Sequence, residues 1–548
     1  MSADNKGGPL SRRSFLKKSF LLAAASTGIL SCKEMPTLRG RTFTGGIVGA
    51  NIKAGHMLLE RKILPSGAAE KTGIVIVGGG IAGLSAAREL KKNRFEDFVM
   101  LELEGAVGGN SISGANTVSA YPWGAHYIPL PGEDAVFVRE LFEEFGIIEG
   151  YDRKGLPIYN EFYLCADPQE RLFIHGRWQE GLVPQLGIPE KDRRQYDEFF
   201  GAMKKFRNSK GRDGRRAFSI PLELSSKDNR FIKYDTITMS RFMSDNGWNS
   251  EYLNWYVDYC CRDDYGCTMR NTSAWAGIHY FASRYGRASN ADPSAVLTWP
   301  EGNGWLVNKI RAGIKDLIRC NACVVNIENT GDNVAVDYYD LKSKTITRII
   351  AKAVIYAAPR FTAYKAIADF RSGLPSYSDK LSYAPWMIAN ITLKANLDGK
   401  GAPLAWDNVN YKSDGLGYIV ANHQNITLHR DKTVITYYHP LTEDNPAEER
   451  RKALKTTYEA WAGKIIKNLS LMHQGIESAI EKIDVWVWGH AMVRPLPGLI
   501  WGEARREVLR PHGKIFFAHS DMSGISIFEE AQYRGITASK RALKEIKA

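Results

Sequence analysis

A short apolar run followed by closely spaced glycines constrains the fold of this chain more than any other feature. Ile74–Val77 reads Ile-Val-Ile-Val, a β-branched run that suits a strand buried on both faces. Gly78, Gly80 and Gly83 follow at G-x-G-x-x-G spacing and open an apolar-periodic helical segment, 84–90. In such a turn the first glycine permits a tight bend, the second lets backbone approach a pyrophosphate, and the third lets helix pack closely on strand.

The next residues complete a dinucleotide-binding unit. A second apolar run, 98–101, ends at Glu102, where a carboxylate can accept hydrogen bonds from an adenosine ribose. The start of the intervening helix offers free N–H groups and the positive end of its dipole to phosphates. Strand, glycines, helix, strand and acid in this order are far more specific than a lone glycine motif. The sequence therefore predicts a Rossmann-type domain.

Beyond Glu102 the chain resembles a family of flavoproteins. Gly108 and Gly109 form an E-x5-GG extension, and the segment 123–127 (Trp-Gly-Ala-His-Tyr) is similar to a GG(S/H)(Y/W) element lying along a flavin. Both are features of the flavin-containing amine oxidase and phytoene desaturase superfamily. The resemblance implies FAD as a tightly held cofactor. The chain departs from the family at Ala106 and Asn110, where members often carry arginines.

Further motifs of that superfamily recur along the chain. The segment 351–359 resembles the "ADAVIVATP" strand that returns to the nucleotide domain, and Val324 stands where members contact adenine through backbone. The segment 513–521 resembles "GrIyFAGe", which places the acid at Asp521 if a one-residue shift is assumed. The segment 528–535 resembles "mEGAxxSG", a helix start beside the flavin whose amides could stabilise negative charge on its reduced ring.

The resemblance thus implies a fold, a domain order and a set of cofactor contacts. The fold class is α/β: a Rossmann-type FAD-binding domain, a doubly wound parallel sheet, interleaved with an α+β substrate domain. The expected segments are a signal (1–32), a tether (33–72), three FAD-binding segments (73–135, 296–368 and 495–548), a mainly helical substrate-domain segment (136–295) and a substrate-domain sheet (369–494). The expected FAD contacts are Gly78, Gly80, Gly83, Glu102, Gly108, Gly109, Ser111, Gly124, Val324, Asp521 and Glu529.

In this superfamily the flavin itself takes the hydride, so the protein needs no nucleophile or metal. Many amine oxidases place a lysine near the flavin, but the matching stretch 386–393 has none, which leaves desaturase-like chemistry open. His490 stands where monoamine oxidases carry a covalent flavin cysteine; a histidine lining the flavin edge without a bond is the commoner arrangement. His126 is the other catalytic candidate. The aromatic residues Trp275, Tyr280 and Trp488 are candidates for the substrate pocket, although such residues more often pack in a core.

The N-terminus reads as a targeting signal. The segment 11–17 (Ser-Arg-Arg-Ser-Phe-Leu-Lys) fits the twin-arginine export pattern, and the apolar region 20–30 is too short to span a bilayer. The segment 29–32 resembles a bacterial lipobox ending at Cys32. The sequence predicts an exported bacterial protein on the periplasmic side, carried by the twin-arginine machinery and lipid-anchored through Cys32. Cleavage near Ser31 without lipidation is the alternative.

Charge and cysteines add little that is specific. The formal net charge is +13, and basic residues gather at 204–216 with interspersed glycine and serine. A solvated loop is the commoner interpretation of such a basic stretch, and contact with anionic lipid near the anchor is the more specific one. No nucleic-acid motif accompanies these charges, so no nucleic-acid partner is expected. Cys320-x-x-Cys323 lacks the second pair that a zinc site needs, and no metal site is expected.

Three functions remain in order of preference. The first is an exported FAD-dependent oxidoreductase that takes a hydride from a C–N or C–C bond of a small organic substrate. The second is a carotenoid-desaturase-like or isomerase-like enzyme acting on an apolar substrate. The third, from another class, is a non-catalytic escort protein with the fold of the GDP-dissociation inhibitors. The acids Glu102 and Asp521 and the export of a folded, loaded protein speak against the third.

Overall fold

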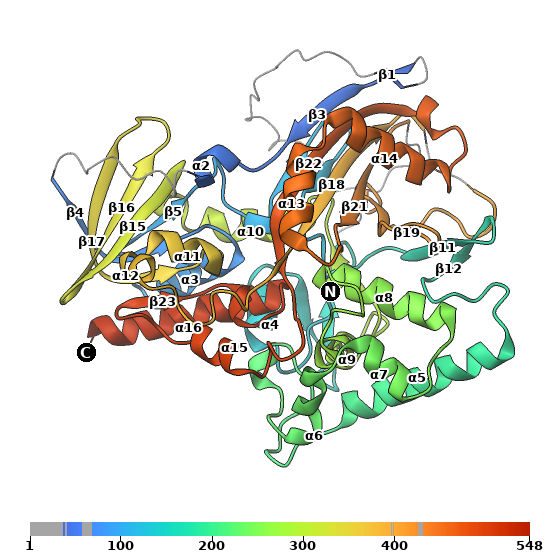
Figure 1. Ribbon diagram of the computed structural model, residues 1–548, viewed down its shortest axis with the longest axis horizontal. Helices are drawn as coiled ribbons and strands as arrows, with labels where there is room; N and C mark the ends of the chain where they lie inside the picture. The colour runs from blue at the N-terminus through green and yellow to red at the C-terminus, as the bar shows by residue number, and fades with distance from the viewer. Residues whose placement is uncertain are drawn as a thin grey trace, which may run out of the picture.

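Two β-sheets with helices on their outer faces form the frame of the molecule (Figure 1). The computed structural model describes residues 37–38, 41–56, 68–395, 397, 399–425 and 431–547. The twin-arginine segment and Cys32 lie outside the described residues. Among the described helices, none is both long and apolar enough to cross a bilayer.

The first sheet has seven strands and carries the glycine motif. Its strands run in the order β14-β5-β4-β17-β16-β15, with β23 paired to β17. The pairs β14–β5, β5–β4, β4–β17 and β17–β23 are parallel, whereas β15, β16 and β17 form an antiparallel meander. Their bounds are β4 (Glu70–Val77), β5 (Phe98–Glu102), β14 (Ile318–Cys320), β15 (Ala322–Thr330), β16 (Asn333–Asp340), β17 (Ile346–Tyr356) and β23 (Ile515–Phe517).

The apolar run in β4 is continuous because both faces of this strand are buried. Ile74 and Ile76 face one core, which α3 (Ile81–Lys92), α10 (Gly304–Ala312) and α16 (Phe528–Lys547) complete. Val75 and Val77 face a second core formed with the antiparallel meander. Side chains alternate between the two faces of a strand, and both faces of β4 are covered by apolar layers. Every position of the run is therefore apolar, and the sequence shows an uninterrupted β-branched run.

The second sheet has eight strands in the order β12-β11-β19-β20-β21-β18-β22-β3. Its pairs are antiparallel except β11–β19 and β22–β3. One face packs on α14 (Tyr458–Ser470) and the other faces the helical segment, as Trp386 and Ile388 show. The bounds are β3 (Thr44–Val48), β11 (Glu170–Ile174), β12 (Arg177–Glu180), β18 (Tyr383–Leu393), β19 (Asp407–Asn410), β20 (Gly417–Val420), β21 (Thr433–Pro440) and β22 (Ile480–Val493).

Helices and short hairpins complete the described chain. The helical segment contains α5 (Glu190–Asn208), α6 (Asn229–Ile232), α7 (Met239–Asp245), α8 (Glu251–Tyr265) and α9 (Ala274–Ala282). The other helices are α2 (Ile52–His56), α4 (Val136–Glu144), α11 (Arg360–Ala366), α12 (Ala368–Ser372), α13 (Pro446–Lys455) and α15 (Glu503–Val508). The short strands are β1 (Thr37–Leu38), β2 (Arg41–Thr42), β6 (Ser113–Ala115), β7 (Ala120–Pro122), β8 (Tyr127–Pro129), β9 (Ile148–Tyr151), β10 (Pro157–Tyr159) and β13 (Val296–Thr298).

The α/β fold class is confirmed, with two corrections to its organisation. The segment 33–72 is not only a tether, because its residues 44–48 form β3 and extend the eight-stranded sheet beside β22. The mainly helical segment also gives β11 and β12 to the same sheet. Both departures involve short strands at or next to the edges of the sheet, where the sequence pattern is weak.

The residue that precedes β3 should determine whether this strand stays docked. Phe43 is 4% exposed and belongs to the core beneath α14, so Phe43→Ala should lower the free energy of unfolding by about 3–5 kcal/mol in urea titrations. The control is Val48→Ala, because Val48 is 40% exposed and its truncation should change stability by less than about 0.5 kcal/mol. Equal effects of the two substitutions would contradict the docking of this segment.

Candidate functional site

Two adjoining cavities lie where the sheets meet the helical segment. The nucleotide cavity, of about 290 Å³, runs along the glycine turn, and the aromatic cavity, of about 140 Å³, lies beside the eight-stranded sheet. Residues that line both form the junction between them: Asn110, Ala125, Ala491, Ser526, Ile527 and Phe528. A ligand that fills the nucleotide cavity can therefore present one end to the aromatic cavity.

Each glycine of the opening motif has a separate steric role. A Cβ on Gly83 would lie 1.9 Å from the carbonyl oxygen of Gly78, so α3 can pack this closely only on glycine. Gly78 has a φ of +99°, which favours glycine. A Cβ on Gly80 would meet no atom nearer than 3.9 Å, and Gly80 lines the nucleotide cavity. Its missing side chain therefore leaves room for a ligand rather than for protein.

Glu102 lies at the end of β5, as the sequence predicts, and fixes the glycine turn. Its Oε2 accepts a hydrogen bond from the Gly79 amide at 2.6 Å, and its Oε1 accepts one from the Glu104 amide at 2.8 Å. The side chain is 8% exposed and lines the nucleotide cavity. Burial raises the pKa of Glu102 to about 7. A ribose hydroxyl can donate to the ionised carboxylate or accept from the protonated carboxyl group, so both forms of Glu102 can contact it.

The cavities gather most of the expected contact residues. The nucleotide cavity is lined by Gly78, Gly80, Glu102, Gly108, Gly109, Ser111 and Val324, and the aromatic cavity by Gly124, His126 and Glu529. Gly83 lies behind the wall as a packing residue. Asn110, one of the two departures from the family's arginines, lines both cavities and donates a hydrogen bond from Nδ2 to the Ala491 carbonyl at 2.5 Å.

The structure does not bring Asp521 into the cavity wall. His519 and Ser520 line the nucleotide cavity, whereas Asp521 is 2% exposed and lies behind it. Its Oδ2 accepts hydrogen bonds from the Arg360 amide and the Tyr383 hydroxyl, both at 2.8 Å. Burial opposes ionisation, but His519 and these hydrogen bonds lower the pKa of Asp521. The position that matches the family's acid without a shift is Ser520, and it is Ser520 that lines the cavity.

His490 is likewise turned away from both cavities. Among the described residues that line them is its neighbour Ala491, but not His490. The imidazole of His490 stacks on Phe361 with ring centroids 4.0 Å apart and meets Tyr383 edge-on at 5.7 Å. Burial lowers the pKa of His490 to about 4, so the ring is neutral. This placement does not support a bond from His490 to a cofactor in the nucleotide cavity.

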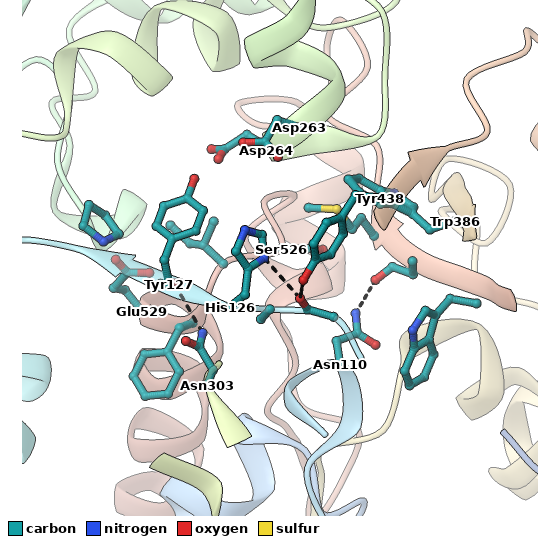
Figure 2. Close-up of a pocket in the computed structure, with 18 of the residues that line it drawn as sticks. Asn110, His126, Tyr127, Asp263, Asp264, Asn303, Trp386, Tyr438, Ser526 and Glu529 are labelled. Atoms are coloured by element: carbon teal, nitrogen blue, oxygen red, sulfur yellow. Dashed lines mark hydrogen bonds between the residues drawn. The ribbon is translucent and has the colours of Figure 1, made fainter. Parts of the chain in front are cut away.

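Aromatic side chains form the walls of the second cavity (Figure 2). The rings of His126 and Tyr438 lie 4.5 Å apart, and the Tyr438 hydroxyl donates to the Gly124 carbonyl at 2.9 Å. Burial lowers the pKa of His126 to about 4, so the ring is neutral here too. Trp386 and Trp488 complete the wall. Trp275 and Tyr280 are not among the described residues that line either cavity.

Carboxylates stand at two places in this aromatic cavity. Figure 2 shows Asp263 and Asp264 beyond the Tyr127 ring and Glu529 beside the same tyrosine. Asp264 pairs with Arg284 at 2.6 Å. Burial, followed by the charge of Asp264, raises the pKa of Asp263 to about 7, and burial raises the pKa of Glu529 to about 7. The cavity therefore holds two carboxyl groups that a bound cation would drive to ionise.

The start of α16 separates the two cavities. Ile527 and Phe528 line both, and Glu529 lines the aromatic one. The helix is 20 residues long, and the N–H groups of its first turn have no partner within the helix. Together with the helix dipole they favour negative charge at the junction, as the sequence predicts for the "mEGAxxSG" segment.

Sequence reasoning missed the acids on α8 and their partner Arg284. Asp263 and Asp264 follow two buried cysteines near the end of α8, and Arg284 follows α9, so these residues are adjacent only after folding. The run Cys-Cys-Arg-Asp-Asp at the buried end of α8 was the available signal, because charged residues are seldom buried unless they are paired. Among the described residues no group of three or more His, Cys, Asp or Glu side chains could hold a metal ion.

Comparison with known proteins supports the fold. A profile of the NAD(P)-binding Rossmann-like domain matches residues 76–145. By sequence, no protein with a curated description matches the chain significantly. By structure, a double mutant of putrescine oxidase matches 87% of this chain and 100% of its own, with a TM-score of 0.64 and 14% identity.

Two further solved structures are similar. The cyclohexylamine oxidase of Brevibacterium oxydans matches 87% of this chain and 100% of its own, with a TM-score of 0.61 and 13% identity. The fatty acid isomerase of P. acnes that produces CLA matches 86% of this chain and 98% of its own, with a TM-score of 0.56 and 16% identity. The chain therefore has the fold of the amine oxidases, built on a Rossmann-type nucleotide-binding domain.

The glycine turn offers a matched pair of substitutions. Gly80→Ala should leave the fold intact but weaken nucleotide binding, because its Cβ projects into open space in the cavity. Gly83→Ala should destabilise the protein itself, since its Cβ collides with the backbone of Gly78. Thermal unfolding and the yield of bound cofactor measure the two effects separately. A Gly80→Ala protein that binds cofactor like the wild type would show that the ligand does not approach this turn.

Proposed function

We propose that this chain is an FAD-dependent oxidoreductase that takes a hydride from the carbon beside the nitrogen of a cationic amine. The observation that carries this proposal is the pair of carboxyl groups, Asp263 and Glu529, in an aromatic cavity that adjoins the nucleotide cavity. A nucleotide cavity alone would fit many cofactors and substrates. The acids restrict the charge of the molecule that enters beside it.

The residues present suit FAD. Glu102 and the glycine turn would hold the adenosine and pyrophosphate, Val324 would lie along the adenine, and the start of α16 would face the flavin ring. A pyrophosphate bound against this turn needs open space at Gly80 and close packing of α3 at Gly83, and both are present. When bound, the flavin supplies the hydride acceptor, and the protein supplies orientation and electrostatics.

The charge of the aromatic cavity favours an amine over an apolar substrate. With Asp264 paired to Arg284, ionised Asp263 and Glu529 leave the cavity negative. The rings of Tyr438, Trp386 and Trp488 offer faces on which an ammonium group is attracted. An alkene or fatty chain would leave the carboxyl groups buried without a partner, which is costly. The desaturase-like and isomerase-like alternative lacks such a supporting feature.

Asp263 is the group best placed to manage the substrate's proton. Among the described residues, no lysine lines either cavity, in agreement with its absence from the strand β18. An amine binds as an ammonium ion but must lose a proton before its carbon gives up a hydride. A carboxylate oxygen of Asp263 would first pair with the ammonium and then accept that proton, for which a pKa near neutrality is suited.

We further propose that the protein is exported through the twin-arginine machinery and anchored through Cys32, on the strength of the sequence motifs. The basic stretch 204–216 is no part of this proposal. In Figure 1 it lies with α5 and α6 at the bottom, on the opposite side of the molecule from β3. Some of its arginines also have partners, such as Arg216, which lies 3.7 Å from Glu133. Residues 204–208 are the end of α5 and the rest of the stretch is a loop, with side chains that are exposed or half-buried, so a solvated surface is the better interpretation.

The direct test is spectroscopic. The purified protein should show flavin absorbance close to one equivalent, and anaerobic addition of a primary amine should bleach it. A panel of amines, fatty acids and carotenoid-like alkenes distinguishes the proposal from its alternatives. Protein without bound flavin would favour an escort protein and refute both enzymatic functions, and bleaching by apolar alkenes alone would favour the desaturase-like reaction.

A substitution at Asp263 tests the binding of the cation. Asp263→Asn should raise KM for the amine about 10- to 100-fold, the equivalent of one charged hydrogen bond. Because its pKa is about 7, Asp263 is protonated at lower pH and cannot pair with an ammonium ion, so wild-type KM should fall as pH rises through about 7.

That dependence of KM on pH should be much weaker in Asp263→Asn. Glu529 in the same cavity keeps part of it, since its pKa is also near 7. The matched control is the exposed Asp292, for which Asp292→Asn should leave KM and its pH dependence unchanged. An unaltered KM in Asp263→Asn would refute the contact with the substrate.

A further inference from the structure

Two charged residues at the start of α16 depart from the superfamily's motif. Where "mEGAxxSG" has glycine and serine, this chain has Glu530 and Arg534. Both side chains are buried, with 0% and 5% of their surface exposed. A charge is costly to bury unless it is paired, so a buried carboxylate and guanidinium in place of two small residues require partners.

The partners come from outside the helix and form a cluster of four charges: Glu223, Arg505, Glu530 and Arg534. Glu223 Oε2 accepts hydrogen bonds from Arg505 at 2.8 Å and from Arg534 at 2.9 Å. Ser523 bridges the remaining pair, because its Oγ accepts from Arg534 Nε at 2.9 Å and donates to Glu530 Oε2 at 2.5 Å. Two acids and two arginines balance within the cluster.

The electrostatics agree with a tightly paired cluster. Burial alone would raise the pKa of Glu223, but Arg505 and Arg534 hold it at about 2. Arg505 is also anchored to backbone, because its Nε donates to the Met522 carbonyl at 2.8 Å and its Nη1 to that of Ile500 at 3.2 Å. Each charged side chain of the cluster thus has a hydrogen-bonding partner. If Glu530 and Arg534 are both replaced, Glu223 and Arg505 still form an ion pair with each other.

The cluster joins two walls of the proposed active site. Glu223 belongs to the short 3-10 helix Leu222–Leu224 of the helical segment, and the Leu222 amide donates to Glu530 Oε1. Two residues before Leu222, Ile220 lines the aromatic cavity. One residue before Glu530, Glu529 lines the same cavity, and Phe528 lines both. The cluster therefore ties the helical segment to the helix start that faces the junction.

We infer that Glu530, Arg534, Glu223 and Arg505 are positioning residues that hold the first turn of α16 and the Ile220 wall in register around the cofactor's reactive end. The expected effect on the binding of cofactor and substrate rests on the proposed function, whereas the connection between the two cavity walls does not. None of the four lines either cavity among the described residues, so they act through Phe528, Glu529 and Ile220.

The test is the charge-neutral double variant Glu530→Gln with Arg534→Gln in the full-length protein. Hydrogen exchange of backbone amides in residues 219–226 and in the first turn of α16 should accelerate about tenfold. Flavin should dissociate about tenfold more readily, and KM for the amine should rise more than kcat falls. The second variant, Glu530→Gly with Arg534→Ser, restores the superfamily's residues and should behave similarly.

The control is the surface pair formed by Glu507 on α15 and Arg510 just after it, as Glu507→Gln with Arg510→Gln, which should change none of these readouts. Unchanged exchange in residues 219–226 in both cluster variants would overturn the tie. Faster exchange with unchanged flavin affinity and KM, or loss of the fold in both variants, would reduce the cluster to a structural role and overturn the positioning. Wild-type protein without flavin would refute the proposed function, while hydrogen exchange would still decide whether the tie exists.

Discussion

Close backbone packing between α3 and α16 is the constraint on which the rest of the site depends. A Cβ on Gly83 would lie 1.9 Å from the Gly78 carbonyl, and a Cβ on Gly535 would lie 2.1 Å from that of Ala82. The missing side chain of Gly83 lets α3 pack on the glycine turn, and that of Gly535 lets α16 approach α3. This contact brings the first turn of α16 beside the glycine turn, so that one end of the chain completes a cavity begun near the other.

Local motifs could be predicted from the sequence because their geometry is fixed within a few residues. Gly78, Gly80 and Glu102 lie where a strand-turn-helix unit must place them, and the fold class followed from that unit. His490 and Asp521 were assigned by analogy with a motif, and both proved to lie behind the cavity wall. His490 lies on β22, where side chains alternate between faces, and its neighbour Ala491 lines the cavities instead. Asp521 lies in a short 3-10 helix, one residue beyond Ser520, which lines the nucleotide cavity.

The acids that α8 contributes to the aromatic cavity could not be found in this way. Asp263 lies on α8 and Arg284 follows α9, and they reach one cavity only because the helical segment folds onto the second sheet. The same is true of Glu223, which finds Arg505 and Arg534 across a long stretch of chain. Such pairs depend on tertiary packing, and a single sequence contains no periodic pattern that would predict them. Edge strand β3 was missed for a related reason, since its burial is only partial.

Two sets of buried or half-buried charged residues among those described differ in how far their charges are neutralised by other residues. In the cluster of Glu223, Arg505, Glu530 and Arg534 every charge is neutralised within the protein, and the pKa of Glu223 is accordingly held at about 2. In the aromatic cavity neither Asp263 nor Glu529 forms an ion pair with another described residue, and burial raises the pKa of each to about 7. This difference supports the proposal made above that a cationic ligand enters the aromatic cavity. The imbalance thus argues for a cationic ligand independently of any resemblance to amine oxidases.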